Sequence, residues 1–197
     1  MRKIVKRLLS IYLVLFLATN VFAAAPELTP ELKERLQADA KVIEAWVAMP
    51  IFIDAVKSQN AKKLALDQIK ASDAEWIKIQ KAKEKPNALM EQILAHPVGE
   101  WLRQKNVESK GSYPEAFLCD NQGANVAVSK FTSDYWQGDE EKWIASFNNG
   151  KGAVFFGPPE FDDSTKSMQV QVSVPVMDQG KAIGVLVVGV KFSTLKK

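Results

Sequence analysis

The chain has 197 residues, a formal net charge of +3 at pH 7, one histidine and one cysteine. These two residues make a zinc site improbable, and Ser-His-Asp or Cys-His catalysis needs a histidine beside the nucleophile. The lone His96 precedes Pro97 at an expected helix boundary, which favours a surface or capping role. The sequence contains no glycine-rich phosphate loop and no EF-hand spacing. We therefore expect neither an enzyme nor a bound cofactor or metal.

Residues 1–25 are expected to form a secretory signal peptide. A basic start precedes an apolar run at residues 8–22, and small residues follow at 23–25. The run is short for a membrane-spanning helix, although an uncleaved anchor is the alternative. Cleavage leaves 22 basic against 23 acidic residues, a net charge of −1, and no basic footprint for a nucleic acid. We expect one periplasmic domain at residues 26–197.

The first half of this domain is expected to be helical. Thr29 and Pro30 are typical of a helix start, and Pro50 should kink or interrupt the helix because proline lacks an N–H donor. Apolar residues recur at spacings of three and four along one face: Leu32, Leu36, Ala40, Ile43 and Val47.

Two further helix starts are expected in this half. Residues 72–75 fit a capping box, so a helix carrying Trp76 is predicted to begin there. Another helix is predicted from about Asn87, and Pro97 either stops it or begins a further turn.

The second half of the domain is predicted to be a sheet. Residues 116–120 and 124–129 form a hairpin around Asn121-Gln122-Gly123, and a third segment at residues 152–157 ends at a Pro158-Pro159 break. Residues 168–176 alternate apolar and polar side chains, whereas residues 183–192 are apolar on both faces and should form a central strand. The single cysteine, Cys119, is read as a buried thiol, with an intermolecular disulfide as the alternative. We expect a five-stranded antiparallel sheet with helices on one face.

Residues 131–143, FTSDYWQGDEEKW, are expected to cover the other face of this sheet. Asp139 is a suitable cap for a short helix in which Trp143 and Phe147 share a face. The acidic residues are then explained by helix-start chemistry. Tyr135 and Trp136 lie beside a bend and carry polar tips, so they fit either the wall of a small-molecule site or simple packing.

The order of these segments resembles the Cache (PDC, extracytoplasmic PAS-like) sensor domains. The resemblance covers residues 28–192, and its most telling pieces are Asp134-Tyr135 followed by Trp143, and Val174-Pro175-Val176 followed by Ile183-Gly184-Val185. It implies an α+β fold, with a PAS-like antiparallel five-stranded sheet, a long N-terminal helix and further helices packed on it.

The resemblance also implies a ligand site between the sheet and its cover. An amino acid, amine or small carboxylate would contact Tyr135, Trp136 and Trp143 on the cover, Gln171 and Ser173 on the sheet, and Asp162 before the fourth strand. Amino-acid-binding members carry an arginine and a tyrosine where this chain has Glu141 and Ile144, and Lys142 is the nearest substitute for the arginine.

These features together indicate a periplasmic sensor module. It would capture a small ligand, close residues 135–143 over the sheet, and signal through a separate membrane-bound kinase, cyclase, chemoreceptor or transporter. A homodimer or partner contact through the N-terminal helix is also expected. The alternative is a ligandless interaction protein that keeps the Cache fold.

Overall fold

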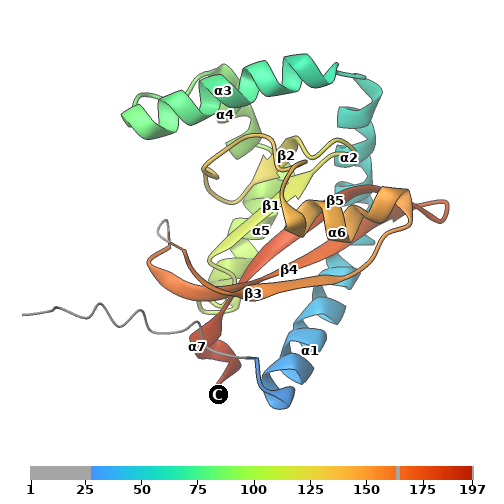
Figure 1. Cartoon of the computed structure of the whole chain (residues 1–197), viewed down its shortest axis with the longest axis vertical. Coiled ribbons are helices and arrows are strands. Elements are labelled where there is room, and N and C mark those ends of the chain that lie inside the picture. Colours follow the sequence, from blue (N-terminus) through green and yellow to red (C-terminus); the bar gives the residue numbers. More distant parts are fainter. Residues whose placement is uncertain (1–27, 163–164, 197) are drawn as a thin grey trace, which may run out of the picture.

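A computed structural model describes residues 28–162 and 165–196. The predicted signal peptide lies outside these residues. Within the described part of the chain, no helix is both long and apolar enough to cross a membrane. Five helices come first, followed by a sheet whose strands are interrupted by one further short helix (Figure 1). The division into a helical half and a sheet half is therefore as predicted.

The helices begin and end where capping groups and prolines require. The first five are α1 (Pro30–Val47), α2 (Pro50–Ala61), α3 (Leu66–Ala82), α4 (Ala88–Leu94) and α5 (Pro97–Glu108). Thr29 caps α1. The helix ends at Val47 and a new helix, α2, begins at Pro50, which confirms the predicted interruption. His96 caps α5, because its Nδ1 accepts a hydrogen bond from the Val98 amide at 3.1 Å.

The predicted helix start at residues 72–75 is wrong, because these residues lie inside α3. The helix begins six residues earlier, where the Gln68 side chain accepts a hydrogen bond from the amide of Ala65 at 3.0 Å. The short polar side chains at 72–75 fit a cap equally well by sequence, but Asp73 makes contacts with the sheet cover instead.

The sheet has five antiparallel strands in the order β2-β1-β5-β4-β3. The strands are β1 (Glu115–Cys119), β2 (Asn125–Val128), β3 (Phe155–Asp162), β4 (Ser167–Asp178) and β5 (Lys181–Lys191). The last strand is central, as its two apolar faces predicted. A final short helix, α7 (Phe192–Leu195), packs beside α1. The α+β fold class that the Cache resemblance implied is confirmed.

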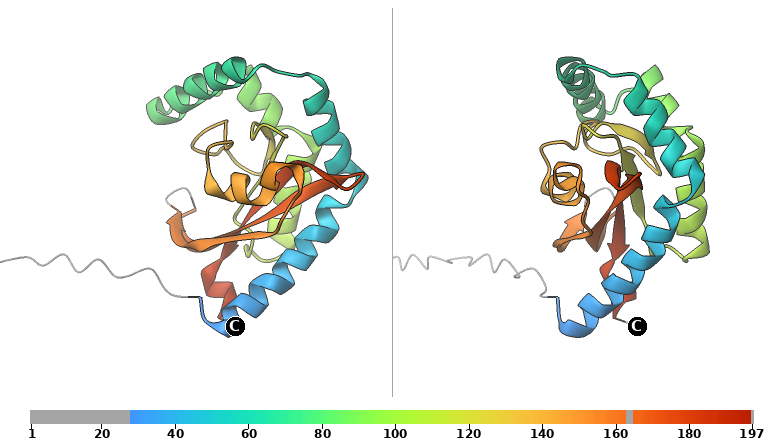
Figure 2. Two further views of the ribbon diagram at one scale, coloured as in Figure 1. Left: turned by 45° about the vertical axis from the view of Figure 1, so that its right-hand side comes forward. Right: turned by 90° about the vertical axis from the view of Figure 1, so that its right-hand side faces the viewer.

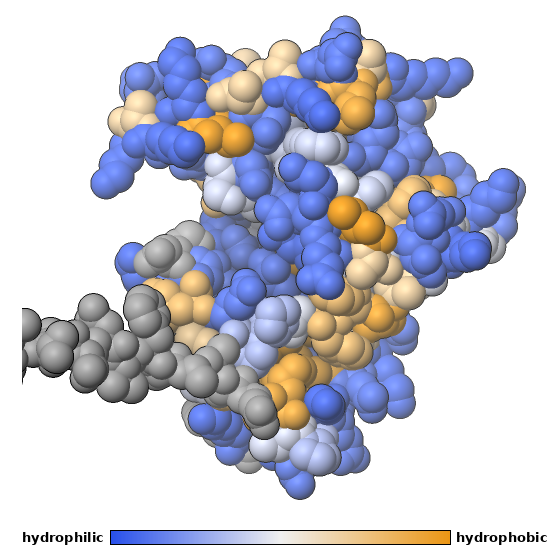
Figure 3. Space-filling model, viewed as in Figure 1, coloured by the Kyte–Doolittle hydropathy of each residue, from blue (hydrophilic) through white to orange (hydrophobic). Residues whose placement is uncertain are grey.

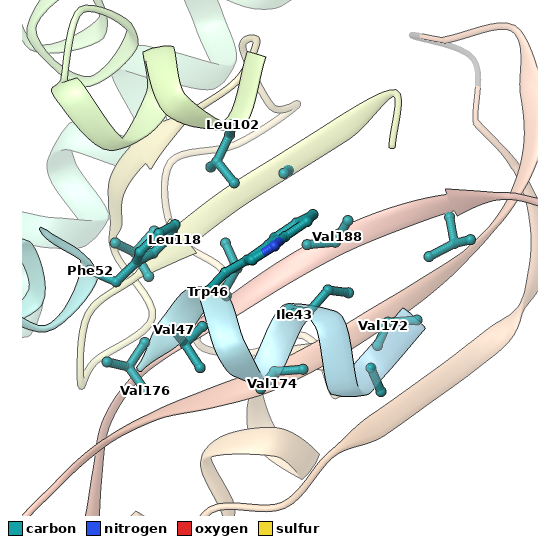
Figure 4. Packing of buried hydrophobic residues seen from close by; sticks show 14 of the residues in the cluster. Ile43, Trp46, Val47, Phe52, Leu102, Leu118, Val172, Val174, Val176 and Val188 are labelled. Atoms are coloured by element: carbon teal, nitrogen blue, oxygen red, sulfur yellow. The ribbon is translucent and has the colours of Figure 1, made fainter. Parts of the chain in front are cut away.

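Two hydrophobic cores lie on opposite faces of the sheet. On the first face, Ile43, Trp46 and Val47 of α1 pack against alternate valines of β4 (Figure 4). Helices α2 and α5 complete this layer, which lies to the right of the sheet in the right-hand view of Figure 2. On the second face, Trp76 of α3 and Tyr135 join a smaller core with the sheet. Burial on both sides explains why β5 carries apolar side chains in both directions.

Strand β3 lies at one edge of the sheet and contains Pro158 and Pro159. The predicted break at these prolines is wrong, because the strand continues past them with a shift of register between Phe156 and Pro159. Adjacent N–H groups in a strand point to opposite sides, so one proline lacks a donor on the open edge and the other lacks one toward β4. The irregular register next to Pro159 accommodates the missing donor on the paired side.

Residues 131–147 cover the second face, as predicted, and end in α6 (Glu141–Phe147). Glu140 rather than the predicted Asp139 occupies the cap position, so the helix starts one residue later than expected. Trp143 and Phe147 stack with their ring centroids 4.7 Å apart. The helix stops in η1 (Asn148–Gly150), whose three residues all have positive φ.

Candidate functional site

A cavity of about 400 Å³ lies between the second face of the sheet and residues 131–142. Its floor comes from β1 and β4, its roof from residues 131–137 and Lys142, and one side from the outer half of β3. Figure 3 shows the molecule hollowed between α3 and this end of the sheet, with a mainly hydrophilic surface. A cavity of this size can enclose a small metabolite.

The floor is set by the register of three strands. Glu115 of β1 and Gln171 of β4 both pair with Gly189 of β5, so a carboxyl and an amide flank a position that has no side chain. The Gln169 side chain lies over Gly189, and a Cβ at that glycine would collide with the Gln169 amide. Glycine is therefore required here so that Gln169 can line the cavity.

The roof is fastened to α3 through one carboxylate. Asp73 Oδ1 accepts hydrogen bonds from the amides of Tyr135 at 2.8 Å and Trp136 at 3.0 Å. The roof is also paired with the β1–β2 hairpin, because Asn125 donates its amide hydrogen to the Tyr135 carbonyl and Gln137 donates to Gly123. These bonds hold a segment without regular secondary structure in one conformation.

Three indole N–H groups fix the same region by donating to backbone carbonyls. The pairs are Trp76 to Thr132 at 2.9 Å, Trp136 to Gln122 at 2.7 Å and Trp143 to Asp120 at 3.2 Å. A buried indole N–H needs an acceptor, and each of these acceptors belongs to the hairpin or the roof. The tryptophans thus hold the cover in place.

Glu115 is the most deeply buried acid of the cavity, with 7% of its surface exposed. Its pKa is raised to about 7, chiefly by burial and also by the nearby Asp162 carboxyl, to which it is hydrogen-bonded. Lys130 and Lys142 act in the opposite direction. Asp162 also accepts a hydrogen bond from the Gln169 amide.

A second acid, Asp134, lies on the roof. Burial raises its pKa, although a hydrogen bond from Gln137 and the charge of Lys142 partly oppose the shift. Lys142 itself is held 3.7 Å from Glu140 and lies over the Phe117 ring. Lys142 therefore already has a carboxylate partner outside the cavity.

The six residues predicted for the ligand site divide into two groups. Gln171 and Asp162 line the cavity. Ser173 shares a face of β4 with Gln171 but is completely buried and does not line the cavity, and its hydroxyl has no partner among the described residues. Trp136 and Trp143 face the β1–β2 hairpin and are not among the residues that line the cavity.

Tyr135 is likewise absent from the cavity lining. Its ring packs against Trp76 with centroids 5.9 Å apart, and it borders a separate, smaller cavity of about 170 Å³ near α2 and α4. The structure therefore brings Gln171 and Asp162 together and places the three predicted aromatic residues elsewhere.

Several residues that line the cavity were not predicted as site residues. Glu115 begins a strand whose other residues are apolar, and this buried acid was the signal that could have found it. Gln169 shares the polar face of β4 with Gln171, so the alternation already pointed to it. Asp134 and Gln137 were assigned to the cover but not to its inner side. Their orientation depends on the Asp73 contact, which no local pattern reveals.

No protein-family model matches the chain, and no curated protein matches it significantly. Solved structures with a similar fold include the sensory domain of the Campylobacter jejuni chemoreceptor Tlp3 with isoleucine bound, at 16% identity and a TM-score of 0.39. They also include the Escherichia coli DcuS sensor domain, at 14% identity and a TM-score of 0.45. A third is the Vibrio cholerae histidine kinase DctB sensor domain, at 13% identity and a TM-score of 0.35. The chain is similar to bacterial sensory domains.

These matches cover 86%, 84% and 82% of the chain respectively. They cover 95% of the DcuS domain but only 66% of the Tlp3 structure and 59% of the DctB structure, so the chain spans less than two thirds of those two.

Proposed function

We propose that the chain is an exported periplasmic sensor module that binds a small molecule and signals through a separate membrane partner. The observation that supports this proposal is the cavity of about 400 Å³ between the sheet and its fastened cover. Its size, its convergent polar side chains and its partly apolar walls suit an amino acid, an amine or a small carboxylate. Gln171 and Asp162 are proposed to contact the ligand directly.

The three predicted aromatic residues have a different role in this proposal. Tyr135, Trp136 and Trp143 hold the cover against α3 and the hairpin, so they would shape the cavity without touching its contents. A ligand changes a conformation only when it contacts the two states differently. Closure of residues 135–143 would therefore act through the inner side chains of the roof, chiefly Asp134 and Gln137.

A thermal-shift screen tests the proposal. Purified protein would be heated with amino acids, amines and small carboxylates, and a ligand is expected to raise the melting temperature because it binds only the folded state. Gln171→Ala is expected to remove most of this response, since Gln171 lies on the cavity floor. The matched control is Gln104→Ala on α5, an exposed glutamine that does not line this cavity.

The outcome separates the two functional hypotheses. No response across a broad panel would contradict the sensor proposal and favour a ligandless interaction protein that keeps the fold. The membrane partner would be identified by cross-linking in ligand-treated cells. Analytical ultracentrifugation tests the predicted homodimer through α1. The buried face of α1 packs on the chain's own sheet, so the opposite face of the helix would have to form the dimer contact.

A further inference from the structure

Carboxylates outnumber cations around the cavity. Among the described residues that line it, Lys142 is the one basic side chain, and it already lies near Glu140 outside the cavity. The acidic side chains that line it come from three separate segments: Glu115, Asp134, Glu160 and Asp162. An anionic ligand would meet repulsion from these groups, whereas a cation would be attracted to them.

The cavity floor also contains a buried acceptor without a donor among the described residues. Gln169 is 3% exposed and lines the cavity, and its Oε1 has no hydrogen-bond partner among the described residues. Its Nε2 donates to Asp162, which holds the side chain in one orientation with the carbonyl oxygen packed over Gly189 on the cavity floor. A buried carbonyl without a donor is unfavourable, and a shift of this flexible amide that exposed the oxygen to a ligand N–H would satisfy it.

Aromatic rings form part of the same wall. Phe117, Phe131 and Phe161 line the cavity beside the acids. The faces of such rings attract cations, and the Lys142 ammonium already lies 5.7 Å from the Phe117 centroid. The lining also contains hydroxyl and amide donors, but its formal charge is predominantly negative and part of its wall is aromatic.

We propose that the ligand is a small organic cation whose ammonium group donates hydrogen bonds to Glu115, Asp162 and the free carbonyl of Gln169. This inference rests on the proposed sensor function and specifies its ligand class. The cation would replace the proton shared by the Glu115 and Asp162 carboxyls. Binding would therefore release a proton, and the Lys130 and Lys142 charges that also face Glu115 would favour this release.

A matched series of four-carbon compounds tests the charge preference. Butylamine and 1,4-diaminobutane carry ammonium groups, 4-aminobutyrate is zwitterionic, butyrate is anionic and butanol is neutral. We expect the two amines to raise the melting temperature and to bind measurably by calorimetry, whereas butyrate and butanol do not. We also expect amine affinity to increase severalfold between pH 6 and pH 8, because the carboxyl pair must lose its proton.

Substitution of Glu115 provides the second part of the test. Glu115→Gln keeps the shape of the side chain and removes its charge, so it is expected to weaken amine binding at least tenfold. Glu141→Gln is the control, because this exposed acid of α6 changes the net charge equally without lining the cavity. If Glu115→Gln does not fold, proton release by the wild-type protein, measured by calorimetry in buffers of different ionisation enthalpy, replaces it.

The results distinguish failure of this inference from failure of the proposed function. Preferential binding of butyrate or 4-aminobutyrate would overturn the cation class but leave a sensor. Stabilisation by calcium chloride and not by amines would do the same. Absence of any response, both here and in the broad screen, would overturn both. Amine binding with proton release and loss in Glu115→Gln supports the inference.

Discussion

Glu115 should make the stability of the free protein depend on pH. Its pKa is about 7 in the folded chain against an ordinary value of 4.5, because it is buried and hydrogen-bonded to Asp162. The folded state therefore holds a proton that the unfolded state releases between these values. The contribution of this group to the unfolding free energy is fully present below pH 4.5 and is lost as the pH rises through 7. The total loss is about 3 kcal/mol at most.

Urea unfolding at pH 4.5, 6 and 8 measures this effect. The unfolding free energy of the wild type is expected to fall more steeply with pH than that of Glu115→Gln, because glutamine does not titrate. Parallel curves for the two proteins would show that the Glu115 carboxyl ionises as freely in the folded state as in the unfolded state.

Gly189 is predicted to control the shape of the cavity floor. In Gly189→Ala the new Cβ would collide with the Gln169 amide, which is the end of a flexible side chain and can move. We expect ligand affinity to fall at least tenfold while the melting temperature changes little. Gly157→Ala on β3 is the control, since its nearest non-neighbouring atom would be 3.5 Å away. Equal affinity in both variants would contradict this role for Gly189.

The sequence identified the polar face of β4 but not the inner side of the roof. Gln171 was found because strict alternation along a strand shows which side chains share a face. The tryptophans were assigned to the ligand because rings with polar tips suit a pocket wall. They suit a buried hydrogen bond to a carbonyl equally well, and only the path of the loop between the partners decides between the two.

At the level of elements, the contact between α3 and the roof should determine the order of the cover. Asp73→Ala would leave the amides of Tyr135 and Trp136 without their acceptor, which is expected to lower the unfolding free energy by about 2–3 kcal/mol. The control is Glu75→Ala on the same helix, whose exposed ion pair with Lys78 should contribute little. Urea unfolding measures both variants.

Hydrogen exchange adds a local measurement to this prediction. Amides of residues 131–137 are expected to exchange faster in Asp73→Ala, whereas the amides of β5 should be unaffected until global unfolding. An unchanged exchange rate in the roof would show that the hairpin alone holds this segment.

The sequence predicted helices and strands well where a repeating pattern extended over many residues. The stripe along α1 and the alternation along β4 each involve a whole element, so one atypical residue does not change the interpretation. Helix starts depend on one or two hydrogen bonds. Residues 72–75 and Gln68 offer similar capping chemistry, and the long-range bond from Asp73 to the roof was not visible locally.

At the level of the whole molecule, β4 connects the cavity to α1. Gln171 faces the cavity, whereas the neighbouring Val170 and Val172 pack in the core that contains α1 on the opposite face. A ligand that shifts β4 is therefore expected to change the environment of α1. Hydrogen exchange with saturating ligand should show protection in β4 and residues 131–137, and altered exchange in α1. Unaltered exchange in α1 would exclude this route.

The two prolines of β3 have a consequence for how copies of this protein meet. A strand at the border of a sheet can recruit a strand from another molecule, and repeated recruitment leads to fibrous aggregates. One of the two consecutive prolines, Pro158 and Pro159, removes a donor from this border, and the pair coincides with the irregular register of the strand. At high protein concentration, molecules should therefore resist polymerising through β3, even though this edge strand borders the cavity and, among the described residues, pairs with a strand on one side alone.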